Sequence, residues 1–120
     1  MTAQRVLVVD DEVVSRIVLA RVLEVAGFEI TQADDVPIAR EAIRRHDFDL
    51  VVADYLMPSG TGLDLLDETR KQGVPLILVT GFASTDAIAD ERVAFVDGHL
   101  TKPFDSDNLL NEIAQLLERP

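Results

Sequence analysis

The sequence of 120 residues contains no cysteine and no tryptophan, and aromatic residues make up only 5% of it. The absence of cysteine excludes disulfide bonds, thiolate metal sites and cysteine nucleophiles. No apolar run approaches the ~20 residues of a transmembrane helix, and a charged pattern begins too early for a signal peptide. We therefore expect a soluble, cytoplasmic domain.

Basic residues are also scarce, with 11 Lys and Arg against 22 Asp and Glu and a formal net charge of −11. Phosphate backbones and anionic lipids are bound by clusters of Lys and Arg, so we expect neither direct nucleic-acid binding nor membrane binding. The hydrophobic fraction of 48% is far above that of a disordered acidic tail. The length suits one compact domain over residues 1–120.

Five short apolar runs recur, and each is followed by a turn and a helix-like stretch. They are Val6–Val9, Phe28–Ala33, Leu50–Ala53, Leu76–Val79 and a segment near His99–Thr101. This alternation predicts an α/β fold, a doubly wound five-stranded parallel sheet with helices on both faces. The second run mixes apolar and polar residues, which indicates an edge strand.

Helical spacing follows each of these runs. In the first helix we expect the buried face to consist of Val14, Ile17, Val18, Val22 and Val25. The other helices are expected from Val36-Pro37, from about Leu63 to Gly73, over about Thr85–Ala94, and after Asp105 as N-cap.

Polar side chains follow four of the expected strands: Asp10 and Asp11, then Asp54, Thr80 and Lys102. In a parallel sheet these strand ends meet at the edge where ligands bind. Three converging carboxylates repel one another and favour a divalent cation, and oxygen ligands favour Mg²⁺ or Mn²⁺. A hydroxyl and an ammonium beside them complement a phosphoryl group, so the pattern predicts phosphoryl transfer.

Each feature alone also has an ordinary structural explanation. Asp10 or Asp11 could cap the first helix, Thr80-Gly81 could be a turn, and Lys102-Pro103 could lead into a helix. Their common position at one sheet edge favours the functional interpretation.

Four motifs, VLVVDDE, LVVADYLMP, LVTG and LTKPF, occur in this order over nearly the whole chain. In this combination the sequence resembles the receiver domain of two-component response regulators. The resemblance implies a flavodoxin-like fold with strand order 2-1-3-4-5, as in a chemotaxis receiver.

The resemblance also implies roles for the acidic residues. Asp54 would accept a phosphoryl group from a phosphohistidine on a sensor histidine kinase or a histidine phosphotransfer protein. Asp11 would bind Mg²⁺ directly, Asp10 mostly through water, and Asp54 and the backbone carbonyl of Leu56 would complete the protein ligands. Lys102 would pair with the phosphoryl oxygens.

The signalling output is implied in the same way. Thr80 would hydrogen-bond the phosphoryl group, and Pro103 would follow a cis peptide bond that directs Lys102 inward. A downstream protein would bind the face formed by the fourth helix, the fifth strand and the last helix. His99 stands where the family usually has Tyr or Phe. Leu56 and Phe82, both apolar, stand where water access is controlled, which suggests a long-lived phosphoryl group.

We therefore expect a stand-alone receiver that catalyses its own phosphorylation and dephosphorylation rather than a conventional turnover enzyme, as a monomer or weak homodimer. Two alternatives are a receiver module of a hybrid histidine kinase or larger regulator, and an interaction module without phosphorylation. A phosphatase of the haloacid-dehalogenase type would need an acid two residues after the nucleophile, where this chain has Leu56.

Overall fold

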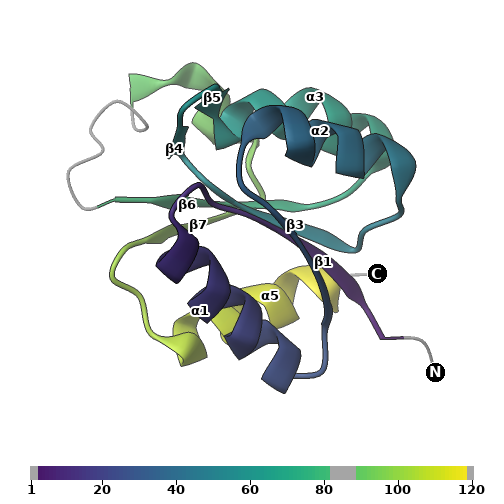
Figure 1. Ribbon diagram of the computed structural model, residues 1–120, viewed down its shortest axis with the longest axis vertical. Coiled ribbons are helices and arrows are strands. Elements are labelled where there is room, and N and C mark those ends of the chain that lie inside the picture. The colour runs from purple at the N-terminus through teal and green to yellow at the C-terminus, as the bar shows by residue number, and fades with distance from the viewer. Residues whose placement is uncertain (1–2, 82–88, 119–120) are drawn as a thin grey trace.

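The computed structural model describes residues 3–81 and 89–118. Five parallel strands form one sheet in the order β2-β1-β3-β6-β7 (Figure 1). The strands are β1 (Arg5–Val9), β2 (Glu29–Ala33), β3 (Leu50–Asp54), β6 (Leu76–Thr80) and β7 (Gly98–Thr101). This confirms the predicted strand order and the edge position of the second strand.

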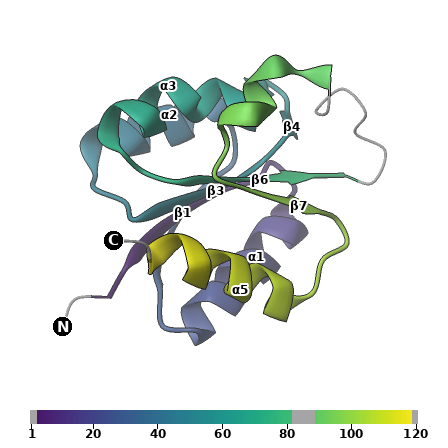
Figure 2. The ribbon, with the colours of Figure 1, turned by 180° about the vertical axis from the view of Figure 1, so that it is seen from behind.

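Helices cover both faces of the sheet, as predicted. α1 (Val13–Val25) and α5 (Ser106–Leu117) lie on one face, and α2 (Val36–Arg45) and α3 (Leu66–Gln72) lie on the other (Figures 1 and 2). A 3-10 helix, η1 (Gly62–Leu65), precedes α3. α3 ends where Gly73 adopts φ 69°, a left-handed conformation that glycine accepts readily.

Two apolar clusters lie on opposite sides of the sheet because successive strand residues point to opposite faces. In β1, for example, Leu7 and Val9 pack toward α2 and α3, whereas Val6 and Val8 pack toward α1 and α5. The interior strands β1, β3 and β6 are buried on both faces, which explains their uninterrupted apolar runs.

The buried face of α1 differs from the prediction. The residues that pack inward are Leu19, Ala20 and Leu23. Of the predicted face, Val22 is half-buried, while Val14 and Val25 are 72% and 74% exposed and Ile17 and Val18 are also exposed. α1 carries two apolar stripes, and helical spacing alone does not determine which of them faces the sheet.

The predicted fourth helix, about Thr85–Ala94, lies partly outside the described residues, which resume at residue 89. Its described end differs from the prediction: Glu91–Phe95 forms a 3-10 helix, η2. The Asp90 side chain accepts a hydrogen bond from the Arg92 backbone N–H, so a new helical turn begins there. In the described part of the chain, no helix has the length and apolar character needed to cross a bilayer.

Candidate functional site

The predicted acidic cluster forms at the carboxyl edge of the sheet. β1 and β3 are neighbours, and Val9 pairs with Ala53, so the residues that follow them lie side by side. Asp10, Asp11 and Asp54 each present a carboxylate oxygen within 4.8 Å of the others. Asp10 is only 2% exposed, Asp54 is half-buried and Asp11 is exposed. The cluster therefore has a buried floor and an open side toward solvent.

Lys102 reaches this cluster from the end of β7. Its backbone N–H donates to the Thr80 carbonyl at 2.8 Å, and the Lys102–Pro103 peptide bond is cis, as predicted. The ammonium Nζ lies 3.2 Å from Asp10 Oδ2 and 3.5 Å from Asp54 Oδ1. The structure thus brings together the four charged residues that the sequence pattern singled out.

The cluster carries more negative than positive charge. Burial raises the pKa of Asp54 to about 6; Lys102 acts in the opposite direction, and the charges of Asp10 and Asp11 add to the rise. Burial alone would lower the pKa of Lys102, but the carboxylates of Asp54 and Asp10 outweigh it and the net change is upward. One ammonium therefore does not balance three carboxylates. These oxygen donors could hold a metal ion, and hard cations such as Mg²⁺ suit them.

Sequence reasoning missed contacts from the start of α1. Lys102 Nζ donates to Ser15 Oγ at 3.0 Å, and Arg16 Nη1 donates to the Asp10 carbonyl at 2.9 Å. Neither aspartate is the N-cap of α1; that position is held by Glu12, whose backbone N–H donates to Asp10 Oδ1 at 2.9 Å. No motif marks Ser15, although its place in the first turn after the acidic pair put it near the same edge.

The loop after Asp54 folds back against the end of β3. A short antiparallel pair, β4 (Leu56–Met57) and β5 (Gly60–Thr61), follows β3 directly. Gly62 then donates to the Tyr55 carbonyl at 2.9 Å, and a Cβ on Gly62 would lie 2.6 Å from the Asp54 carbonyl oxygen. Only glycine fits so close to this backbone. The Leu56 side chain is 68% exposed, and its carbonyl stays a predicted metal ligand.

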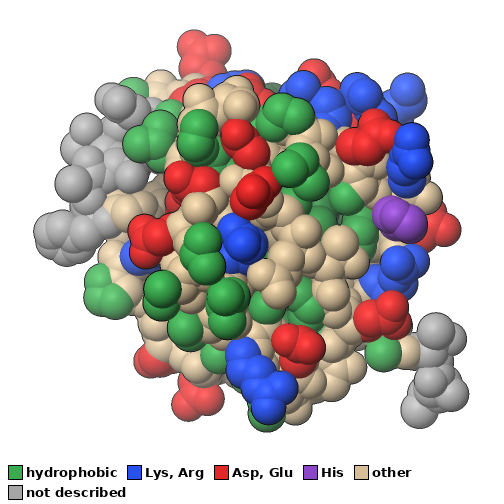
Figure 3. All heavy atoms as spheres, viewed as in Figure 1, with side chains coloured by type: hydrophobic (Ala, Val, Ile, Leu, Met, Phe, Trp, Pro, Cys, Tyr) green, Lys and Arg blue, Asp and Glu red, His purple; other side chains and the backbone are tan. Residues whose placement is uncertain are grey.

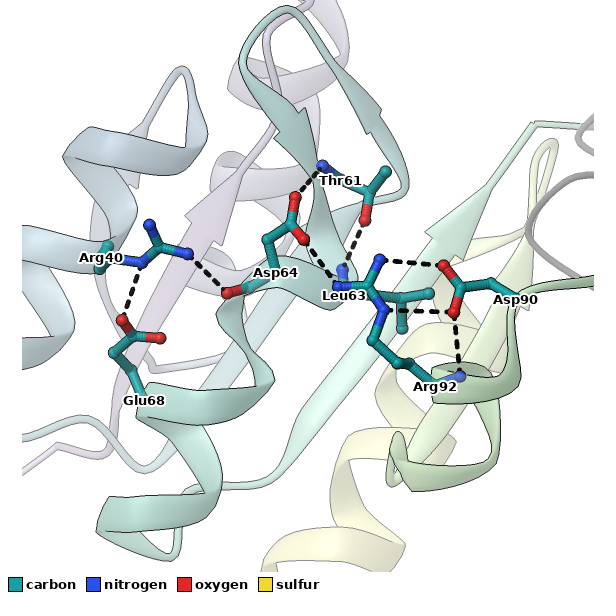
Figure 4. A network of polar contacts seen from close by, with 7 residues as sticks. All are labelled: Arg40, Thr61, Leu63, Asp64, Glu68, Asp90 and Arg92. Atoms are coloured by element: carbon teal, nitrogen blue, oxygen red, sulfur yellow. Dashed lines mark hydrogen bonds and ion pairs between the residues drawn. The ribbon is translucent and has the colours of Figure 1, made fainter.

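A polar network ties this loop to the segment that leads into β7 (Figure 4). Asp64 accepts the Thr61 backbone N–H at 2.8 Å and pairs with Arg92 at 2.7 Å. Burial would raise the pKa of Asp64, but the hydrogen bonds from Arg92 and Thr61 reverse this and hold it below its ordinary value. Arg92 also pairs with Asp90 at 2.9 Å, and Arg40 donates to the Asp64 carbonyl at 2.8 Å.

Thr80, at the end of β6, is buried, and its hydroxyl lies 2.9 Å from Nε2 of the exposed His99. Asp54 pairs with Val79 in the sheet, so Thr80 is one residue further along the same edge. Both residues were singled out from the sequence, but their contact was not. Phe82, the second residue expected to limit water access, lies outside the described residues.

The site opens into a hollow of about 610 Å³ whose polar end contains Asp10, Asp54 and Lys102. Its other walls are mostly apolar side chains of α1 and α5 and of the segment between β7 and α5, among them Val14, Val18, Phe104 and Leu109. A second hollow of about 550 Å³ shares Val18 and Val22 with it and continues along α1 and α5. Figure 3 shows hydrophobic side chains gathered over α1 on this side of the molecule.

Comparison with known proteins agrees with this geometry. Residues 6–114 match the family model for the response regulator receiver domain. The chemotaxis protein CheY-3 of Vibrio cholerae is 33% identical over 120 residues, covering 96% of this chain and 92% of that protein. The probable transcriptional regulatory protein TcrX of Mycobacterium tuberculosis is 36% identical over 119 residues, covering 95% of this chain and 50% of that protein.

A solved structure shows the same likeness. The response regulator TrrA from Thermotoga maritima, crystallised in complex with Mg²⁺ and BeF, matches with a TM-score of 0.85 and 33% sequence identity. The match covers 95% of this chain and 99% of that chain.

Proposed function

The chain belongs to the response regulator receiver domain family, and we therefore propose that it accepts a phosphoryl group on Asp54 from a phosphohistidine of a partner protein. The Asp54 carboxylate attacks phosphorus, the phosphorus–nitrogen bond breaks, and the histidine leaves with the electron pair of that bond. The proposal depends above all on Asp54 lying 3.5 Å from Lys102 Nζ within the cluster of carboxylates.

The surrounding residues have complementary roles in this proposal. Lys102 offsets negative charge on the transferred group, and Thr80 donates a hydrogen bond to it. Asp10, Asp11, Asp54 and the Leu56 carbonyl would hold Mg²⁺, with Mn²⁺ as a substitute. When bound, the ion supplies positive charge that neutralises phosphoryl oxygens. With these residues the receiver catalyses its own phosphorylation and dephosphorylation. The apolar side chains of Leu56 and Phe82 restrict water near the phosphoryl group and so favour a long lifetime.

The donor is a sensor histidine kinase or a histidine phosphotransfer protein, and we propose that it docks on the exposed apolar face of α1. Asp54 lines the same hollow as Val14 and Val18, so a phosphohistidine that enters this hollow reaches Asp54 beside the apolar face of α1. The exposed side chains of Ile17 and Val25 extend this surface along the helix. An apolar helix face on the donor would cover these side chains, since exposed apolar patches of this kind commonly mark interaction sites.

We also propose a downstream partner, a cellular location and an oligomeric state. A downstream protein binds the face built from the expected fourth helix, about Thr85–Ala94, with β7 and α5. It makes no direct contact to nucleic acid, and the receiver is a cytoplasmic monomer or weak homodimer. A single-domain receiver is supported by the likeness to CheY-3, of which the chain spans 92%. The likeness to TcrX, of which it spans 50%, supports the alternative of a module within a larger regulator.

The test is titration with beryllofluoride or acetyl phosphate, with and without Mg²⁺, followed by amide NMR. We expect Mg²⁺-dependent shifts around Asp54 in the wild type and in Asp47→Asn, whose side chain is exposed outside the site. Asp54→Asn should not respond. A response of Asp54→Asn equal to that of the wild type would overturn the phosphoacceptor proposal, and no response in any protein would favour the interaction module.

A further inference from the structure

The contact between Thr80 of β6 and His99 of β7 constrains where the protons of these two side chains lie. Thr80 Oγ1 and His99 Nε2 are 2.9 Å apart, a normal hydrogen-bond length, and the direction of donation depends on the ring tautomer. The threonine is buried at the sheet edge, whereas the histidine is exposed. The pair therefore connects the interior of the site with the surface of β7.

A threonine hydroxyl has one proton to donate and lone pairs with which to accept. In the proposed phosphorylated state the hydroxyl donates its hydrogen bond to a phosphoryl oxygen. Oγ1 can then only accept a hydrogen bond from any further partner. If His99 Nε2 carries no proton, two lone pairs face each other and the 2.9 Å contact breaks. If Nε2 carries the proton, the contact persists and the two hydrogen bonds run in series from the ring to the phosphoryl group.

We propose that His99 is a positioning residue that donates its Nε2 proton to Thr80 Oγ1 when Asp54 is phosphorylated, and so holds the Thr80 hydroxyl toward the phosphoryl oxygen. This inference rests on the proposed phosphorylation of Asp54. A Phe at this place has no hydrogen-bond donor and could not make this contact. The signal at the surface of β7 is then a fixed ring tautomer and orientation.

The first experiment records ring ¹⁵N shifts of histidine in the beryllofluoride-bound, full-length chain at pH 8.5, where an imidazole is ordinarily neutral. The chain has two histidines, so His46, at the end of α2, serves as an internal reference. We expect a protonated Nε2 in His99 whose shift changes in Thr80→Val but not in Thr101→Val, the residue paired with Thr80 in the sheet. An unprotonated Nε2, or no change in Thr80→Val, would overturn the inference.

The second experiment separates hydrogen bonding from packing. His99→Gln keeps an N–H donor, whereas His99→Phe keeps a ring and loses the donor. We expect His99→Phe to bind beryllofluoride about five-fold more weakly than the wild type, the effect of one lost hydrogen bond, and His99→Gln to remain close to the wild type. Equal affinities for the two variants would contradict the role of the donor.

These outcomes are distinguishable from failure of the proposed function. If beryllofluoride leaves the amide signals around Asp54 unchanged in the wild type, the phosphoacceptor proposal and the inference both fall. If the signals around Asp54 respond, but His99 Nε2 is unprotonated and the two His99 variants bind beryllofluoride equally well, only the inference about His99 falls.

Discussion

Lys102 Nζ lies 3.5 Å from Asp54 Oδ1, although the two residues come from the ends of different strands, β7 and β3. The ammonium also contacts Asp10, so it is shared between two carboxylates. A shared cation of this kind reduces carboxylate repulsion without abolishing it, which leaves the site receptive both to a further cation and to an incoming phosphoryl group.

Removal of the Lys102 charge should change both the pKa of Asp54 and the rate of phosphorylation. In Lys102→Met the pKa of Asp54 should rise further above about 6, because a neighbouring cation that lowers it is lost. Phosphorylation by acetyl phosphate should slow by about 10²-fold, in line with loss of one preorganised charge contact. Carboxyl ¹³C titration and phosphorylation rates measure the two quantities.

Lys71→Met is the matched control, because Lys71 is the other lysine of the sequence and is exposed on α3. It should change neither quantity. A phosphorylation rate in Lys102→Met equal to that in Lys71→Met would show that the ammonium does not assist the transfer.

The raised pKa of Asp54 predicts a pH-dependent stability difference between the wild type and Asp54→Asn without metal. An acid whose pKa rises from 3.8 to about 6 on folding stabilises the fold below pH 3.8 and loses that contribution as pH rises through 6. Asp54→Asn should therefore be more stable than the wild type at pH 8, by about 1 kcal/mol after allowance for solvent around a half-buried group.

Urea unfolding at pH 4 and pH 8, in EDTA and in excess Mg²⁺, measures this difference. At pH 4 the unfolding free energies of the two proteins should differ little. At pH 8, Mg²⁺ should reduce or reverse the stability advantage of Asp54→Asn, because an ion that binds the folded wild type stabilises it. An Asp54→Asn protein that is less stable than the wild type in EDTA at pH 8 would contradict the prediction.

The two stripes of α1 should respond differently to substitution. Val14 is 72% exposed, so Val14→Thr should change the unfolding free energy by no more than about 0.5 kcal/mol. Leu23→Ala, on the buried stripe, should cost about 3 kcal/mol because it leaves a cavity beneath the sheet. Denaturant unfolding of both variants measures these losses. A larger loss of unfolding free energy in Val14→Thr than in Leu23→Ala would indicate that the buried face is the one expected from the sequence.

Gly62→Ala should destabilise the loop that covers Asp54. The new Cβ would meet the Asp54 carbonyl oxygen at 2.6 Å, so the backbone must move, at a cost of about 1–3 kcal/mol. Gly98→Ala is the comparison: its closest contact, at 2.7 Å, is the end of the Glu112 side chain, which can rotate away. Thermal melts and beryllofluoride affinity should both be more affected in Gly62→Ala, and equal effects would argue against a close-packed loop.

Most of the fold was predictable because its signals are local. Uninterrupted apolar runs such as Leu76–Val79 indicate strands covered on both faces, and Gly73 marks a helix end that requires a left-handed residue. η2 was not predictable in the same way, because the Asp90 cap competes with a continuous helix and single-residue capping is a weak signal in a sequence.

The sequence by itself determined that Asp10, Asp11, Asp54, Thr80 and Lys102 lie at or just after strand ends, and the parallel sheet then places them at one edge. Tertiary structure decided what these residues contact. The Ser15 contact to Lys102 and the Thr80 contact to His99 join segments far apart in the chain, and no local pattern encodes such distances. The orientation of α1 was decided in the same way: both of its stripes are apolar, and packing against the sheet buried Leu19 and Leu23 and left Val14 and Val18 in solvent.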